Sequence, residues 1–318
     1  MNYKRLEKCF HDPRIQYERE YISRFQSKDA MHLPLWIGQY RAFCLNAEEM
    51  TDLTDQLQQE NMKIESVAAK LSAHGGLEKY LFDCVFGEII ASNAIELIDC
   101  SHKDLMSAEK AVDGNQPHVR FAPQFKQYKA LLENPLRAPQ CARDIRKIYD
   151  ALLGSDMRMD DPFSLPDGTM FRAGEVCLDT CQADVHHGTV SEQRIIHVID
   201  AALHNLADTE PALKAALFHF VFEYLHPFYD GNGRTGRFIS ALHLREKYHP
   251  AGVLHLSQKL NEHRSQYYKM FRLCEKRLNR ADLTPFVLFF LDQFLEGMRG
   301  SRKELEKRAL EFERLQPA

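Results

Sequence analysis

The sequence predicts a mainly α-helical protein, a helical bundle that carries one small β-hairpin. Glycine is scarce, with 15 in 318 residues, and long stretches repeat apolar residues with the 3.6-residue period of an amphipathic helix. Residues 154–190 differ, because turn signals at Pro166-Asp167-Gly168 and Ala173-Gly174 lie between short extended runs. We therefore expect this segment to form a hairpin or an irregular flap on the helical body.

Helical periodicity divides most of the remaining chain into segments bounded by turn signals and prolines. We expect helices at 48–73, 77–98, 124–134, 141–153, 191–207, 211–225 and from about 234 to 248, with short helices in 99–125 and two or three more in 257–316. We predict an N-terminal helical region at 1–135 and a core at 136–318.

The segment 211–225 should be the central buried helix. Its sequence, PALKAALFHFVFEYL, is apolar almost all round. Thr209 is the expected N-cap, and Pro211 suits the first turn because its missing N–H would have no partner there.

Composition and charge place the chain among ordinary globular proteins. Hydrophobic residues make up 44% and charged residues 27%. The net charge of −4 is not concentrated in a tail, so we expect no nucleic-acid partner. No apolar run reaches transmembrane length, and the charged N-terminus is not a secretory signal, so we expect no membrane association. Eight scattered cysteines without a C-x-x-C pair favour a reduced, cytoplasmic compartment.

The segment 226–237, HPFYDGNGRTGR, has the composition of an anion-binding loop. Gly231-Asn232-Gly233 favours a turn with positive φ, in which main-chain N–H groups converge. A helix restarting near Arg234 would add its free N–H groups and the positive end of its dipole. Arg234 and Arg237 are three positions apart, so both guanidinium groups would project from one face toward a phosphate.

Two further side chains in this segment could carry chemistry. Asp230 could hold a Mg²⁺ ion that bridges phosphates, and His226, with an ordinary pKa of about 6.5, is the natural general base. A glycine turn or a histidine after a helix is usually structural when it occurs alone. The combination is much less common, and it predicts a polyphosphate site. The sequence contains no H-x₃-H or H-E-x-x-H pair, so we do not expect a catalytic zinc site.

The same segment resembles the signature H-P-F-x-D-G-N-G-R-x-x-R of the Fic family of protein adenylyltransferases. Residues 215–220, AALFHF, are similar to the family's helix before that signature. Phe171-Arg172 resembles the start of its target-aligning flap, and Arg264 with Tyr267-Tyr268 resembles its R-x-x-Y-Y. The resemblance implies a Fic fold that uses ATP and Mg²⁺ to transfer AMP to a Tyr, Thr or Ser hydroxyl of a target protein.

The resemblance also implies a role for each site residue. His226 would take the proton from the target hydroxyl, and Asp230 would hold Mg²⁺. Phe228 would pack the loop onto the core, and Tyr267 would line the adenine pocket. The nucleotide phosphates would be bound by Gly231, Asn232, Gly233, Arg234 and Arg237.

A brake on this site is implied by a second likeness. Ser92 and Glu96 lie four positions apart on the apolar helix 77–98 and so share a face. They resemble the family's N-terminal inhibitory helix, S-x-x-x-E followed by Gly or Asn, although Leu97 stands in that last place. The resemblance implies that Glu96 pairs with Arg237 and prevents the γ-phosphate from seating correctly, so that the resting enzyme is largely inactive.

Several alternatives stay open at the level of sequence. The same site could remove AMP from modified proteins, or transfer another phosphate-containing group. A non-catalytic nucleotide-binding regulator is a different class, but it would have no need of the base His226. The residues do not identify the target protein, and they do not explain why adenine would be preferred over other bases. A homodimer is possible at this level.

Overall fold

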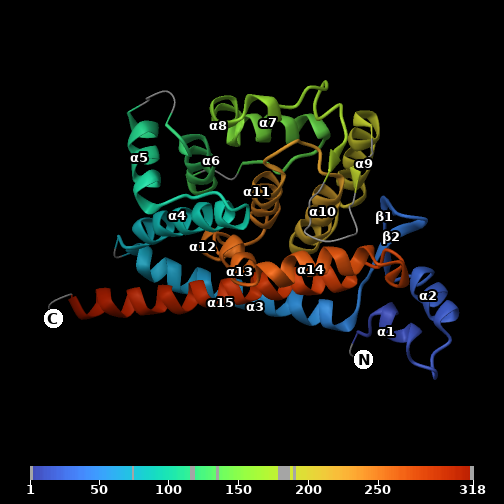
Figure 1. Ribbon diagram of the computed structural model, residues 1–318. Coiled ribbons are helices and arrows are strands. Elements are labelled where there is room, and N and C mark those ends of the chain that lie inside the picture. The colour runs from blue at the N-terminus through green and yellow to red at the C-terminus, as the bar shows by residue number, and fades with distance from the viewer. Residues whose placement is uncertain are drawn as a thin grey trace.

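The computed structural model describes residues 3–73, 75–114, 119–133, 136–177, 187–188 and 191–315. Helices dominate these residues, and their strands form two separate two-stranded sheets (Figure 1). The mainly α-helical class with a small antiparallel hairpin is therefore confirmed. No helix in the described ranges is both long and apolar enough to span a membrane.

The chain first forms two short helices and a hairpin: α1 (Leu6–Phe10), α2 (Tyr17–Phe25), β1 (Ala30–Ile37) and β2 (Tyr40–Leu45). A run of helices follows: α3 (Glu48–Ala73), α4 (Leu77–Ile95), α5 (His102–Asp113), α6 (Ala122–Glu133), α7 (Ala142–Leu152), α8 (Gly154–Asp160) and the 3-10 turn η1 (Pro162–Ser164). A short second hairpin comes next, consisting of β3 (Val176–Cys177) and β4 (His187–Gly188).

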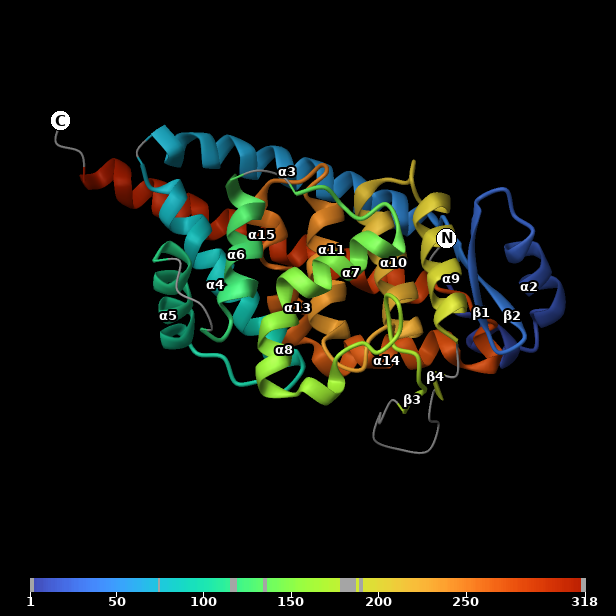
Figure 2. The same cartoon turned by 90° about the horizontal axis from the view of Figure 1, so that it is seen from above.

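Helices fill the remainder of the chain: α9 (Glu192–Asn205), α10 (Pro211–Leu225), α11 (Asn232–Leu244), α12 (Pro250–Val253), α13 (Leu256–Glu262), α14 (Arg264–Glu275), the 3-10 turn η2 (Arg277–Asn279) and α15 (Thr284–Leu315). The long helices α3 and α15 lie side by side in both views (Figures 1 and 2). The helix pair α10 and α11 packs between α15 and the outer helices α7 and α9.

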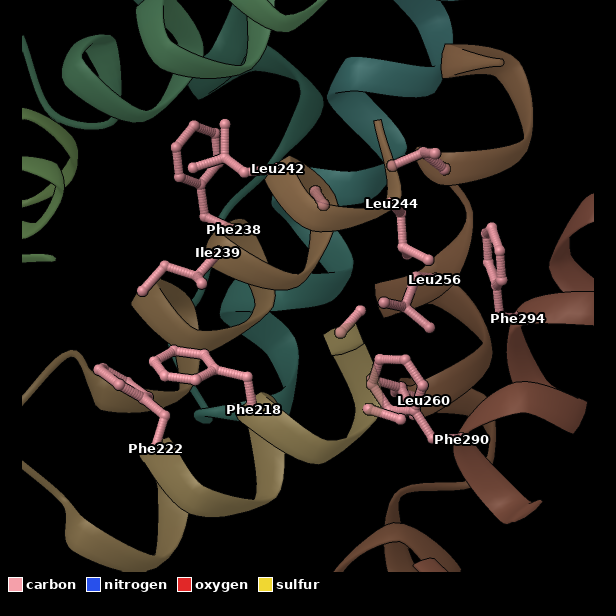
Figure 3. Close-up of a cluster of buried hydrophobic side chains, with 14 of the residues drawn as sticks. Phe218, Phe222, Phe238, Ile239, Leu242, Leu244, Leu256, Leu260, Phe290 and Phe294 are labelled. Atoms are coloured by element: carbon pink, nitrogen blue, oxygen red, sulfur yellow. The ribbon is translucent and has the colours of Figure 1, made fainter. Parts of the chain in front are cut away.

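The hydrophobic core surrounds α10 and α11. A cluster of buried side chains from α10, α11, α13 and α15 fills this region (Figure 3): Phe218, Phe222, Phe238, Ile239, Leu242, Leu244, Leu256, Leu260, Phe290 and Phe294. The expected central helix 211–225 is thus the observed α10, with the same bounds. Its burial on all sides explains why it shows no polar face.

The cap of α10 differs from the expectation. Thr209 is not the N-cap, because Glu210 takes that place and its carboxylate accepts hydrogen bonds from the N–H groups of Ala212 and Leu213. Glu210 also accepts a 2.7 Å bond from the hydroxyl of Tyr248. A longer side chain can cap the helix and reach that partner at the same time, which Thr209 could not do.

The hairpin of β1 and β2 was missed at the level of sequence. Gly38 has a φ of +58° in its turn, and β1 carries Pro34 within a register irregularity between His32 and Trp36. Proline removes a ladder donor and is tolerated at such irregularities. It also interrupts the alternating pattern by which a strand is normally read, which explains the miss.

This first hairpin is attached to the opposite end of the chain. The N–H of Phe43 donates to the carbonyl of Ala281 at 3.1 Å, and the N–H of Leu283 donates to the carbonyl of Phe43 at 2.8 Å. The hydroxyl of Tyr3 donates to the carboxylate of Asp282 at 2.7 Å. The N-terminal segment 3–47 is therefore packed onto the start of α15.

Of the segment 154–190, the expected hairpin is present as the antiparallel pair β3 and β4, in which Val176 is opposite Gly188 and Cys177 is opposite His187. The first part of the segment differs from the expectation, because it forms the helix α8 and the 3-10 turn η1. Residues 178–186 and 189–190, which belong to the same expected flap, lie outside the described residues. Figure 2 shows this pair at the edge of the molecule, beyond α14.

Candidate functional site

The loop between α10 and α11 depends on two left-handed residues. His226, the C-cap of α10, has φ +49° and ψ 64°, and Gly231, the N-cap of α11, has φ +82°. A Cβ atom at Gly231 would lie 3.2 Å from the Tyr149 ring and still closer to Leu153. Both the backbone conformation and the close approach therefore require glycine at this position. α11 begins at Asn232, two residues before the expected restart.

The side chain of Asn232 holds the loop together. Its Oδ1 atom accepts from the N–H of Phe228 at 2.9 Å, and its Nδ2 atom donates to the carbonyl of Phe228 at 2.8 Å. The Phe228 ring is buried and stacks on Tyr149, with 3.8 Å between ring centroids. Both polar atoms of the Asn232 amide are thus bonded to the backbone of Phe228, which holds the loop in its conformation.

The first turn of α11 has main-chain N–H groups without a main-chain acceptor among the residues that the structure describes. Its N-cap, Gly231, has no side chain to accept from the first N–H groups, and the first main-chain bond of the helix runs from Thr235 to Gly231. The N–H groups of residues 232–234 therefore have no main-chain acceptor within the described chain. Such a terminus carries a partial positive charge and binds anions.

Arg234 lies beside this terminus and is almost fully buried. Its Nη2 atom forms an ion pair with the exposed carboxylate of Asp230 at 3.2 Å, and the same atom lies 3.9 Å from the sulfur of Met157. Its Nε atom is buried, with no hydrogen-bond partner among the described residues. Arg234 therefore has an N–H donor that the described chain leaves without a partner while it pairs with Asp230.

Arg237 is only 1% exposed and is held by α4. Its Nε atom donates to the hydroxyl of Ser92 at 2.9 Å, and its Nη2 atom donates to the Ser92 carbonyl at 2.7 Å. The same Nη2 forms an ion pair with Glu96 at 2.8 Å. Burial disfavours the charged guanidinium, but the anionic neighbours, above all Glu96, raise the pKa of Arg237 above its ordinary value. The expected partners Glu96 and Arg237 are thus in contact.

The carboxylate of Glu96 also occupies the space in front of α11. A Cβ atom at Gly233 would overlap it, and would lie 2.8 Å from Nη1 of Arg237. Nη1 is buried and has no hydrogen-bond partner among the described residues. Glu96 therefore stands where an anion bound to the N-terminus of α11 and to Arg237 would have to lie.

The imidazole of His226 is neutral at neutral pH. Burial lowers its pKa to about 4, against the opposing effect of a hydrogen bond with the main-chain carbonyl of Glu223. A neutral imidazole can accept a proton, so His226 is in the form that a general base requires.

The sequence placed Arg172 at the start of the flap but did not reveal that its side chain holds the backbone of the loop after α10. The fully buried guanidinium donates from Nε to the carbonyl of His226 at 2.7 Å and from Nη2 to the carbonyl of Leu225 at 3.2 Å. Nη1 donates to the carbonyl of Gly174. Arg172 thus fixes the left-handed backbone at His226 and joins it to the base of the flap.

The sequence analysis also did not identify Glu223 as a residue near the site. It lies in the apolar sequence of α10, three residues before His226, and its Oε1 atom is buried without a hydrogen-bond partner in the described chain. Burial raises the pKa of its carboxyl to about 8, with Arg237 acting in the opposite direction. A lone acidic residue within an apolar helix was the available signal.

Tyr267 lies in the core. It is 2% exposed, and its hydroxyl is 2.7 Å from Nε2 of His219, whose Nδ1 atom is 3.2 Å from the hydroxyl of Ser240. The structure therefore commits the Tyr267 hydroxyl to His219. It brings together the other expected site residues, which lie on α4, on α11 and in the loop before α11.

The turn after Glu96 is strained. Leu97 has a φ of +59° and forms the left-handed residue of a Schellman motif, in which its N–H donates to Ala94 and the N–H of Ile98 donates to Asn93. Glycine normally takes this place, because a Cβ atom in this conformation costs about 1–2 kcal/mol. The Leu97 side chain is 80% exposed, so packing offsets little of that cost.

We therefore expect Leu97→Gly to raise the free energy of unfolding by about 1 kcal/mol, because the strain is removed and little buried area is lost. Urea denaturation followed by circular dichroism measures the change. Leu97→Ala is the matched control: it removes the exposed side chain but keeps the Cβ atom, so it should leave the stability near that of the parent. Equal gains from the two variants would contradict the strain.

Comparison with known proteins matches one segment of the chain to a family. Residues 139–244 match the Fic/DOC family. The protein adenylyltransferase Fic of Drosophila grimshawi is 35% identical over 100 residues, which cover 31% of this chain and 18% of that protein. The protein of the same name from Drosophila melanogaster is 37% identical over 82 residues, covering 26% and 15%. The matches thus span less than a fifth of these relatives.

The fold is also similar to that of a solved structure. A Fic family protein from Desulfovibrio desulfuricans superposes with a TM-score of 0.58 at 21% sequence identity, over 81% of this chain and 75% of that one. At that identity the similarity concerns the fold.

Proposed function

We propose that this chain, whose residues 139–244 match the Fic/DOC family, is a protein adenylyltransferase. It would transfer AMP from ATP to a Tyr, Thr or Ser hydroxyl of a target protein. The observation that carries the proposal is the loop 226–237, where a neutral His226 lies close to a helix N-terminus whose N–H groups lack main-chain acceptors in the described part of the chain and which carries two buried arginines.

The nucleotide phosphates would bind at the start of α11. The N–H groups of residues 232–234 supply fixed donors. Arg234 has an unused Nε donor, and Arg237 has an unused Nη1 donor. Both are charged, so they favour the negative charge that gathers on the β- and γ-phosphates as pyrophosphate leaves.

A Mg²⁺ ion fits this site only together with the nucleotide. The described residues contain no group of three or more His, Cys, Asp or Glu side chains that could hold a metal. Asp230 supplies one exposed carboxylate at the mouth of the loop. Mg²⁺ commonly takes one or two carboxylates and completes its shell with substrate phosphates and water. Its contribution would be to neutralise phosphate charge.

The transfer itself would be a displacement at the α-phosphorus. The target oxygen bonds to that phosphorus, the bond to the bridging oxygen breaks, and pyrophosphate departs with the electron pair. His226 accepts the proton of the target hydroxyl. Arg172 serves the step indirectly, because its hydrogen bonds hold the His226 backbone in place.

In the resting protein Glu96 would act as a brake. Its carboxylate takes the Nη2 donor of Arg237 and fills the space in front of Gly233. A γ-phosphate cannot use the same donor while Glu96 holds it. Ser92 keeps Arg237 in place in either state, because its two hydrogen bonds do not involve the carboxylate.

Two labelled nucleotides test the reaction. The Glu96→Gly variant is incubated with Mg²⁺, candidate target proteins and ATP labelled at either the α- or the γ-phosphate. We expect label on protein from α-labelled ATP, with release of pyrophosphate, and none from γ-labelled ATP. Label from the γ-position would identify phosphoryl transfer and overturn the proposal. Binding of ATP with no transfer to any target would favour a regulator.

Removal of AMP from modified proteins is the second candidate. The observation in its favour is that the Glu96 side chain is 29% exposed while it pairs with Arg237, so its carboxylate can also meet water near the bound phosphate. If this activity dominates, the parent protein should release AMP from a target that the Glu96→Gly variant has labelled, and the variant should not.

A further inference from the structure

The last turn of α4 has its main-chain carbonyls bound by side chains from other helices. The carbonyl of Ala94 accepts from Nη1 of Arg264 at 3.2 Å. The carbonyl of Ile95 accepts from the hydroxyl of Tyr268 at 3.3 Å. The last carbonyls of a helix lack the N–H partner four residues on, so they can accept from side chains. The carbonyl of Ala94 also accepts from the N–H of Leu97 at 3.1 Å, and Arg264 is its second donor. Glu96 follows these two residues directly.

Both donors come from the first turns of α14. Arg264 and Tyr268 lie four positions apart, so their side chains share one face of that helix. Burial, together with the nearby Glu96, raises the pKa of Tyr268 to about 12. Its hydroxyl therefore keeps its proton and acts as a donor throughout the physiological pH range.

We infer that Arg264 and Tyr268 are positioning residues that hold the last turn of α4, and with it Glu96, against Arg237. This inference rests on the proposed function, because it specifies what keeps the proposed brake in place. Arg264 and Tyr268 act through the α4 backbone, since they bond to the carbonyls of Ala94 and Ile95, whereas the Glu96 carboxylate pairs with Arg237.

The local backbone explains why the turn needs an external hold. Glu96 is the C-cap of α4, and the residue that follows it is the strained, exposed Leu97. Helix ends fray readily, and relief of the strain at Leu97 favours opening. The hydrogen bonds from α14 act in the opposite direction. The balance between them sets the fraction of molecules in which Arg237 is released.

A movement of α14 away from α4 would therefore release Glu96 without any change at the catalytic loop. The two helices are joined here by the Arg264 and Tyr268 hydrogen bonds. A partner or modification that displaces the start of α14 would raise the rate of transfer.

The test makes each substitution in two proteins, the parent with Glu96 and the Glu96→Gly variant. Tyr268→Phe removes only a hydroxyl, and Arg264→Met keeps most of the side-chain stem. In the protein with Glu96, we expect each variant to raise the rate of transfer from α-labelled ATP by about fivefold, the rate equivalent of one hydrogen bond. In the Glu96→Gly protein, where no brake is left to position, neither variant should change kcat or the KM for ATP.

Arg272→Met is the matched control, because Arg272 is an exposed arginine on the same helix. It should leave the rate unchanged in both backgrounds. The inference is overturned if Tyr268→Phe slows transfer equally in both backgrounds, which would indicate a direct role in catalysis. It is also overturned if Tyr268→Phe leaves the rate of the Glu96 protein unchanged.

Hydrogen exchange separates failure of this inference from failure of the proposed function. Amide exchange of residues 92–98 should become faster in Tyr268→Phe whether or not transfer is detected. If Glu96→Gly shows no transfer but exchange in Tyr268→Phe is faster, the proposed function fails and the hold on α4 stands. If Glu96→Gly is active and amide exchange in Tyr268→Phe is unchanged, the positioning role of Arg264 and Tyr268 is wrong and the proposed function stands.

Discussion

Glu96→Gly should raise the rate of AMP transfer by about 100-fold. The substitution removes the carboxylate that pairs with Nη2 of Arg237 at 2.8 Å and clears the space in front of Gly233. Close buried charge pairs couple by about 3 kcal/mol, and each 1.36 kcal/mol is a factor of ten in rate. The two bonds from Ser92 still hold Arg237, so the released guanidinium should be correctly placed for a phosphate.

The rate with α-labelled ATP and titration calorimetry with ATP and AMP together test this expectation. Affinity for ATP should increase more than affinity for AMP, because only the outer phosphates need Arg237. Glu96→Gln is the matched variant, since it removes the charge and keeps the volume. It should fall between the parent and Glu96→Gly. A transfer rate that stays the same in both variants would contradict the brake.

His226→Ala, made in the Glu96→Gly protein, should lower the rate of transfer by about 10²–10⁴-fold, the usual contribution of a general base. Nucleotide affinity should change little, because the phosphate donors lie on α11 and not on His226. His204→Ala, at an exposed histidine, is the control and should have no effect. Persistent transfer in His226→Ala would show that another group takes the proton.

The pH dependence adds a separate check on the base. The pKa of His226 is lowered to about 4 by burial, so the imidazole stays neutral as the pH falls through the ordinary histidine value of about 6.5. The rate of the Glu96→Gly protein should therefore hold across that range and fall only as the pH approaches 4. A midpoint near 6.5 would indicate that His226 is exposed to water in the working enzyme.

The parts of the site that are local in sequence were readable from sequence. Gly231 and the arginines at Arg234 and Arg237 follow from turn and helix periodicity, and the structure places them as that spacing requires. The pairing of Glu96 with Arg237 was reached only through a family resemblance. Its helix neighbour Ser92 is 145 positions from Arg237, and no local pattern can specify a contact at such a separation.

What sequence could not supply depends on tertiary partners. The role of Arg172 depends on carbonyls that come close only after the flap folds against α10. Glu210 displaced Thr209 as a cap because Tyr248, from the turn between α11 and α12, stabilises the longer side chain. The hydroxyl of Tyr267 faces His219 in the core, which a short aromatic motif does not reveal.

The attachment of the N-terminal segment has a consequence for biosynthesis. Tyr3 and Tyr17 bond to Asp282 and Leu278, at separations of 279 and 261 positions. A chain emerging from the ribosome makes α4 and then the loop 226–237 well before residues 278–283 appear. The helix α4, which ends just before Glu96, is therefore available when the loop 226–237 first folds. The N-terminal hairpin must wait for its partners, and closing so large a loop should be among the slow, late steps of folding.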